Sequence, residues 1–235
     1  ENGGIINCVK FENAADKYSR KGLDQLQDFV KHGFKAKALA YLKMENDVLT
    51  GSIAKVLSEE EKAKLVEKLG IINNDLVLVI ADSARIVQAS LGALRVRLGH
   101  ELNLIPSEAI YKFLWVTDFP MFEYSEEDER WVAAHHPFTA PKEEDVDKLF
   151  TDPGHVSSRA YDLVLNGYEL LSGSIRIHSQ ELQAKVFEAI GLSLEDAKAR
   201  FGFFLDSFRY GTPPHGGVGI GLERLIMVLA GTDNI

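Results

Sequence analysis

Apolar residues in the first part of the chain recur at spacings typical of helices. Leu23, Leu26 and Val30 share one helical face, which predicts a helix that ends at Gly33. A similar spacing predicts a longer amphipathic helix over residues 83–102. Both helices are expected to pack one apolar face on a core.

Two further stretches predict strands. Residues 36–44 mix small and apolar side chains, and residues 76–81 form the uninterrupted apolar run of a buried strand. Between them, Ser58 and Glu61 have the spacing of a capping box, which predicts a helix that ends at Gly70. The alternation of helices and strands predicts a small α+β domain.

A proline followed by polar residues marks a predicted boundary, so residues 1–107 and residues 108–235 are expected to form separate domains. In the second domain the pattern predicts a strand over residues 111–117, an acid-rich loop over residues 123–130 and a last helix over residues 222–229. Short strands and helices lie between them. The whole chain is therefore expected to have an α+β fold.

Composition narrows the classes of protein. Apolar residues make up 46% of the 235 positions, but the apolar runs are too short to cross a bilayer, so no membrane partner is expected. Cys8 is the sole cysteine, which favours a reducing compartment, and we expect the cytoplasm. Residues 1–107 carry 15 Lys and Arg against 14 Asp and Glu, whereas residues 108–235 carry 11 against 21. These charges do not indicate a basic surface of the kind that binds nucleic acid non-specifically.

Asn166 and Gly167 separate two apolar runs, a pattern typical of a two-residue type I′ hairpin turn. Such a turn places Val164 opposite Glu169, and alternation then puts Asp162 on the same face as Glu169. Diagonal neighbours of this kind have Cα atoms roughly 7–8 Å apart, so the two carboxylates repel unless a cation lies between them. Magnesium bound to substrate phosphates suits that place. The alternative is that both acids simply face solvent.

Glycines alternate through residues 216–221, which predicts a strand that lies against something flat. A helix is expected directly afterwards and places Arg224 in its first turn, where free backbone N–H groups favour an anion. The alternatives are a dinucleotide-binding turn or a run of packing glycines. The preceding Pro213 and Pro214 and the glycine spacing do not match the dinucleotide pattern.

Two other positions suggest recognition of a small anion. His135 and His136 are adjacent in a predicted loop; their spacing does not match a zinc site, and an imidazole can bond a carboxylate. Arg176 lies in a short predicted strand, where strict alternation from Glu169 would turn it to the opposite face. A bulge at residues 172–174 would return the guanidinium to the face of Glu169, as a fork for a carboxylate.

These elements, in this order, resemble the bacterial aspartyl-tRNA synthetases of class II. The resemblance covers the whole chain. It rests on the stretches Leu114–Phe122, His135–Thr139, Asn166–Glu169, Tyr210–Gly216 and Gly221–Arg224, the last of which is similar to the third motif of class II enzymes. The first domain, with its strand Ala38–Lys43, resembles the α+β (GAD-like) domain that bacterial members insert into the catalytic domain.

The resemblance implies a partial class II antiparallel sheet flanked by helices, with ATP, Mg²⁺ and aspartate as ligands. By position it implies that Asp162 and Glu169 hold the metal, and that Arg176 and His135, in a mobile loop, bind aspartate. The ATP site would include Glu169, Gly221, Leu222, Glu223 and Arg224, with Glu169 and Arg224 catalytic. The family more often has Asp where Glu223 stands, and the acidic character is kept.

The implied partners are tRNA for aspartate, possibly also for asparagine, and a second subunit in a full-length homodimer. The family's anticodon-binding barrel and its first two motifs are not found in these 235 residues. We therefore predict that the 235-residue chain alone has negligible activity, measured as aspartate-dependent pyrophosphate exchange. Exchange near that of a full-length enzyme would contradict this.

Three alternatives stay open at this point. The first is a synthetase-like enzyme that makes asparagine from aspartate through the same adenylate. The second is a non-catalytic module that binds tRNA or another partner. The third, an asparaginyl-tRNA synthetase, is less compatible with the inserted domain.

Overall fold

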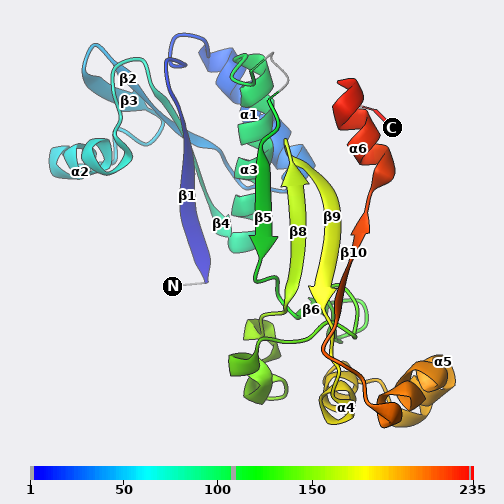
Figure 1. Ribbon diagram of the computed structural model, residues 1–235. Coiled ribbons are helices and arrows are strands. Elements are labelled where there is room, and N and C mark those ends of the chain that lie inside the picture. Colours follow the sequence, from blue (N-terminus) through cyan, green and yellow to red (C-terminus); the bar gives the residue numbers. More distant parts are fainter. Residues whose placement is uncertain (1–2, 107–109, 233) are drawn as a thin grey trace. The chain divides into compact units, whose positions relative to one another are not determined.

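The computed structural model describes residues 3–106, 110–232 and 234–235, which fall into two compact units (Figure 1). The division follows residue 108, one position after the predicted boundary; residues 107–109 themselves lie outside the described part. Each unit is built on a four-stranded antiparallel sheet with helices. The expected α+β class is confirmed.

β4 is a central strand of the first unit, and its side chains are buried on both faces. Leu76, Leu78 and Ile80 join the core formed with α1 and α3, whereas Val77 and Val79 face the core formed with α2. Burial on both faces explains the uninterrupted apolar run in the sequence. The sheet order is β1-β4-β2-β3. In chain order the elements are β1 (Gly4–Phe11), α1 (Arg20–Phe34), β2 (Ala40–Glu45), β3 (Val48–Gly51), α2 (Glu59–Leu69), β4 (Leu76–Ser83) and α3 (Ala84–Glu101).

The ends of α2 follow the local sequence. Ser58 and Glu61 form the predicted capping box, in which each side chain accepts a hydrogen bond from the other's backbone N–H. Gly70 ends the helix in the left-handed conformation, with φ 57°. Both predictions for this helix are confirmed.

The predicted end of α1 at Gly33 is wrong. The helix continues through Gly33, and Lys35 takes the left-handed position with φ 61°. The next residue, Ala36, is buried, and its N–H donates to the carbonyl of Val30 at 3.2 Å. Burial of Ala36 in the core thus fixes where the helix ends, although Gly33 is available two residues before Lys35.

The second unit contains the sheet β10-β9-β8-β5 and a separate hairpin, β6-β7. In Figure 1, α4 and α5 lie beyond one end of the sheet and α6 beyond the other. The predicted first strand, the Asn-Gly hairpin and the last helix are all present. In chain order the elements are β5 (Phe113–Thr117), β6 (Phe122–Ser125), β7 (Arg130–Ala133), η1 (Glu143–Lys148), η2 (Pro153–His155), β8 (Ala160–Leu165), β9 (Tyr168–Ile175), α4 (Gln180–Ala189), α5 (Leu194–Ser207), η3 (Phe208–Tyr210), β10 (Gly216–Ile220) and α6 (Leu222–Ala230).

The prediction of a plain loop over residues 123–130 is wrong. Its first residues form β6, which pairs with β7 as an antiparallel hairpin. Tyr124 lies opposite Trp131, with ring centroids 5.5 Å apart in an edge-to-face contact. Such cross-strand aromatic pairs stabilise short strands, and the acidic residues are concentrated at and beside the turn.

The core of the second unit lies next to the loops at one end of the sheet. Met121 and Phe122 from the hairpin region meet Ile177 after β9 and Phe187 from α4 in this core. Across the described residues of both units, every helix is too short or too polar to cross a membrane.

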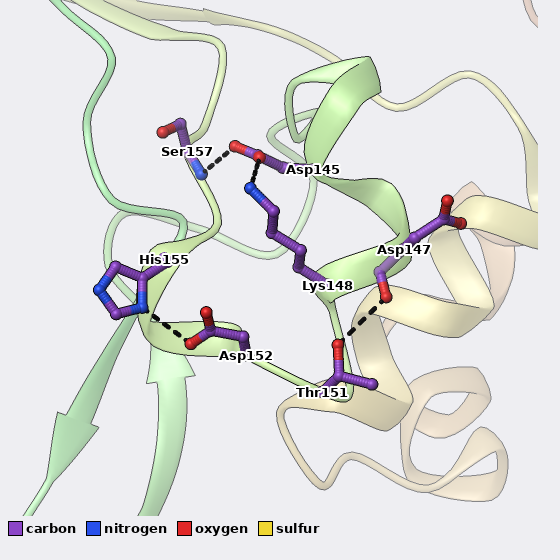
Figure 2. Close-up of polar contacts among 7 residues, drawn as sticks. All are labelled: Asp145, Asp147, Lys148, Thr151, Asp152, His155 and Ser157. Atoms are coloured by element: carbon purple, nitrogen blue, oxygen red, sulfur yellow. Dashed lines mark hydrogen bonds and ion pairs between the residues drawn. The ribbon is translucent and has the colours of Figure 1, made fainter.

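A buried carboxylate fixes the segment between β7 and β8 (Figure 2). Asp145 of η1 is 5% exposed; one of its oxygens accepts the N–H of Ser157 at 2.9 Å, and the other is 2.6 Å from Nζ of Lys148. The bond with Lys148, followed by that with Ser157, holds the pKa of Asp145 below its usual value. The contact thereby ties η1 to the entry of β8.

We predict that Asp145→Asn lowers the free energy of unfolding at neutral pH. Because the folded-state pKa of Asp145 lies below its unfolded value, near 3.9, the carboxylate contributes stability above that pH, and this is lost as pH falls through the folded pKa. The difference from the wild type should shrink in acid. Urea unfolding between about pH 7 and about pH 3 measures this. Asp147→Asn, an exposed neighbour on η1, is the control, and an equal effect of both changes would contradict the prediction.

Candidate active site

The β8–β9 turn has the predicted type I′ geometry. Asn166 and Gly167 both have positive φ, 51° and 89°. Val164 lies opposite Glu169, and Leu165 lies opposite Tyr168, as the turn requires. The local register predicted from the Asn-Gly pair is therefore confirmed.

Beyond this point the register shifts by one residue. Leu163 pairs with Leu171, so Leu170 is an additional residue in β9, and Asp162 lies opposite Ser172. The simple diagonal relation predicted for Asp162 and Glu169 is therefore wrong in detail. Leu170 is buried, and its carbonyl accepts the N–H of Gly221 at 2.9 Å. A contact from outside the hairpin thus accompanies the bulge.

The bulge also turns Arg176 toward the cavity. It lies at Leu170 and not at the predicted residues 172–174, but it has the predicted consequence, because one additional residue exchanges the faces of all residues that follow. The Arg176 N–H donates to the carbonyl of His215 at 2.9 Å, just beyond the end of β9. Arg176 and Glu169 line the same cavity, so this predicted placement is confirmed.

The cavity has a volume of about 480 Å³ and lies over the polar face of the second unit's sheet. It brings together four of the predicted site residues, which are Asp162, Glu169, His135 and Arg176. The other lining residues are Phe119, Ala134, His136, Ser172, Gly173 and Ser174. A second cavity, of about 410 Å³, has Tyr161 and Ile175 in its lining, the neighbours in sequence of Asp162 and Arg176. Asp118 and Lys142 also line it and form an ion pair at 2.6 Å.

Asp162 and Glu169 supply two carboxylates to the cavity. Oδ1 of Asp162 is buried and has no hydrogen-bond partner among the described residues. A buried acceptor of this kind costs free energy unless a donor or a cation satisfies it. Magnesium is commonly held by one or two carboxylates together with substrate phosphates, so this pair fits such an ion. The described residues contain no cluster of three or more His, Cys, Asp or Glu side chains that would hold a metal unaided.

Arg224 lies in the first turn of α6, as predicted, and contacts Glu169. Its Nη1 donates to the Glu169 carbonyl at 2.7 Å and lies 3.5 Å from Oε1 of the same residue. Both side chains are about half exposed. Gly221 is the N-cap of α6, so the bulged strand and the helix start are adjacent. Arg224 itself does not belong to the cavity lining, and neither do Gly221, Leu222 and Glu223.

His136 is the imidazole in contact with Arg176. Nη1 of Arg176 lies against both ring nitrogens, at 3.1 Å from Nδ1, and the backbone N–H of Phe138 also donates to Nδ1. A guanidinium only donates, so His136 must be neutral. Burial, then the positive charge of Arg176 and of His135, lower the pKa of His136 to about 4. His135 itself packs its ring against Phe119, with centroids 4.9 Å apart.

Residues 10–235 match the family described as tRNA synthetases class II (D, K and N). The chain belongs to this family. The family assignment agrees with the resemblance found in the sequence and with the mixed fold of antiparallel sheets and helices.

Individual relatives of this class II chain carry more specific names. The aspartate–tRNA(Asp/Asn) ligase of Anoxybacillus flavithermus is 50% identical over all of this chain, and the aspartate–tRNA ligase of Enterococcus faecalis is 53% identical. The chain spans 39% of the length of each. A solved aspartyl-tRNA synthetase from Entamoeba histolytica is 26% identical, with a TM-score of 0.40 over 76% of this chain and 29% of that chain.

Sequence analysis of this class II chain missed two polar residues of the cavity and misjudged a third. Ser172 and Ser174 face it because the bulge lies before them, at Leu170, whereas the sequence predicted it at residues 172–174. His136 was identified as one of a pair, but His135 was chosen as the ligand for aspartate. Arg176 forms an isolated antiparallel bridge with Thr139, and its guanidinium contacts His136, three residues before Thr139.

Proposed function

We propose that these 235 residues are part of an aspartate–tRNA ligase. Such an enzyme uses ATP to convert aspartate to aspartyl-adenylate and then transfers the aspartyl group to tRNA. The observation that carries the proposal is one cavity that combines two carboxylates with an arginine and a neutral histidine. The names of relatives that are 50–53% identical over the whole chain support the choice of aspartate.

The first half-reaction is an in-line displacement at phosphorus. An oxygen of the aspartate α-carboxylate bonds to the α-phosphorus of ATP, and the bond to pyrophosphate breaks. Asp162 and Glu169 would hold Mg²⁺, which neutralises phosphate charge when bound. Arg224 would bind the terminal phosphate beside Glu169, with Gly221, Leu222 and Glu223 at the ATP site. This chain's own contribution is the positioning of charged groups.

Arg176 would bind the side-chain carboxylate of aspartate, and His135 would lie over the amino acid. A guanidinium that loses water on binding needs a negative partner, so the neutral side chain of asparagine would leave its charge uncompensated. The closed mobile loop implied for His135 stays a prediction. So does selection of aspartate by Arg176.

The first unit, residues 1–108, is proposed to be the inserted α+β domain, and residues 109–235 the carboxy-terminal part of the catalytic domain. Edge strand β5 exposes Phe113, Leu114 and Trp115 by 56–61%, on both of its faces. Natural proteins normally protect such an edge, which supports a role as part of a larger sheet. tRNA for aspartate or also asparagine, a homodimeric full-length enzyme and a cytoplasmic location belong to the same proposal.

Amino-acid dependence of pyrophosphate exchange tests the proposed function. The full-length protein that contains this chain is expected to exchange pyrophosphate into ATP with aspartate but not with asparagine, and to aspartylate tRNA. Ammonia-dependent formation of asparagine without tRNA would instead identify the amidating alternative. Absence of adenylate formation with any amino acid would leave only a binding role.

A further inference from the structure

Contacts outside the cavity hold the loop that carries the two histidines. The Pro137 carbonyl accepts from Nε2 of Gln183 at 2.8 Å, and the Phe138 carbonyl accepts from the N–H of Ile177 at 2.9 Å. The Phe138 ring is centred among three phenylalanine rings at 4.9–6.1 Å, those of Phe187, Phe201 and Phe204. The backbone that directly follows His136 is therefore held in place and bonded to the residue that follows Arg176.

Gln183 is an unusual member of this support. It lies on α4, is 1% exposed, and is next to the apolar core of the second unit. Its Nε2 binds Pro137, but its Oε1 has no hydrogen-bond partner among the described residues. A buried amide that is only half satisfied is a poor contributor to stability, and an apolar side chain of equal length would pack without that penalty. The bond to Pro137 is what this side chain contributes.

The bond acts on the residue that contacts Arg176. Pro137 directly follows His136, and the N–H of Phe138 donates to Nδ1 of His136 at 3.2 Å. That bond makes Nδ1 an acceptor, and Nη1 of Arg176 lies against both ring nitrogens, 3.1 Å from Nδ1. Oγ of Ser174 lies 3.4 Å from Nε2. The orientation of the imidazole, and with it that of the guanidinium, depends on the backbone of residues 136–138.

We propose that Gln183 is a positioning residue for aspartate recognition, which acts through the Pro137 carbonyl to set the His136 ring and thereby the Arg176 guanidinium. The choice of aspartate as the substrate rests on the proposed function. The placement of His136 by Gln183 does not depend on that function. Gln183 touches no substrate, because it does not belong to the cavity lining.

Gln183→Met tests this, since methionine has similar length and no donor. In the full-length enzyme the KM for aspartate is expected to rise about tenfold, because misplacement of a binding group is costly, while kcat and the KM for ATP stay within about twofold. Gln180→Met, an exposed glutamine at the start of α4, is the matched control and should change nothing. Equal changes for aspartate and ATP, together with lower thermal stability, would show a purely structural role and overturn the proposal.

A second variant checks the route through His136. In a His136→Asn background, Gln183→Met should add little to the KM for aspartate, because residues that act in one chain of contacts are not additive. Full additivity would overturn the proposal.

A substrate-free measurement separates this inference from the proposed function. In the full-length protein without substrates, the NMR titration of His136, assigned with His136→Asn, should shift toward the ordinary histidine pKa when Gln183 is replaced by Met. An unchanged titration would overturn the positioning role, whatever the substrate proves to be. Failure of the wild-type enzyme to use aspartate would overturn the proposed function and leave this result standing.

Discussion

Arg176→Met is expected to lower kcat/KM for aspartate by roughly 10²- to 10³-fold. Removing one partner of a desolvated charge pair costs about 2–5 kcal/mol, and each 1.4 kcal/mol corresponds to about tenfold. The methionine keeps much of the length of the side chain but leaves the substrate carboxylate without a donor. The loss should appear in the KM for aspartate, with a much smaller change in the KM for ATP. Steady-state pyrophosphate exchange by the full-length protein measures both.

Two further variants make this result specific. Arg176→Lys keeps the charge but not the planar fork, so its loss should be intermediate. Arg200→Met, on the exposed surface of α5, is the control and should have no effect. If Arg176→Met weakened ATP binding and left aspartate binding unchanged, the assignment of Arg176 to the amino acid would be wrong.

Glu169→Gln is expected to slow aspartate-dependent pyrophosphate exchange by about 10²- to 10³-fold, the usual effect of losing one group that stabilises charge in the transition state. Glutamine has the same shape but no charge to hold a cation. The bond from Arg224 to the Glu169 backbone carbonyl does not depend on the side chain, so the helix start should stay in place. The rate should also require a higher concentration of Mg²⁺ than in the wild type.

Glu181→Gln provides the matched control for this change. Glu181 is 79% exposed on α4, and its carboxylate is in a surface ion pair with Lys185 at 2.8 Å. Exposed pairs of this kind contribute little, so activity should remain within about twofold. A Glu169→Gln enzyme with normal rate and normal Mg²⁺ dependence would contradict a metal role for Glu169.

Short-range chemistry made part of the fold predictable. The Asn166-Gly167 turn was predicted because two successive residues with positive φ strongly restrict the sequence, and the pairing of Val164 with Glu169 followed from it. The capping box at Ser58 is equally local. Strand β1, by contrast, was not predicted; it is paired with β4, far along the chain.

Long-range contacts account for the errors. The end of α1 passed Gly33 because burial of Ala36 sets the last turn, and β6 and β7 form around the Tyr124–Trp131 contact. In both cases the local sequence allowed more than one conformation. A neighbour distant in the sequence, or across a strand pair, selected one of them.

The sequence by itself determined the hairpin turn and the ends of α2, because each depends on neighbours only a few positions apart. It also determined the family resemblance and the residue types of the site. The tertiary structure decided where along β9 the change of face occurs. Leu170 is added to β9 where its carbonyl meets Gly221, and this single additional residue turns Ser172, Ser174 and Arg176 to the side of Asp162. Because side chains alternate along a strand, a one-residue shift exchanges its faces. The contact that accompanies this shift comes from Gly221, between β10 and α6 and some fifty residues further along the chain.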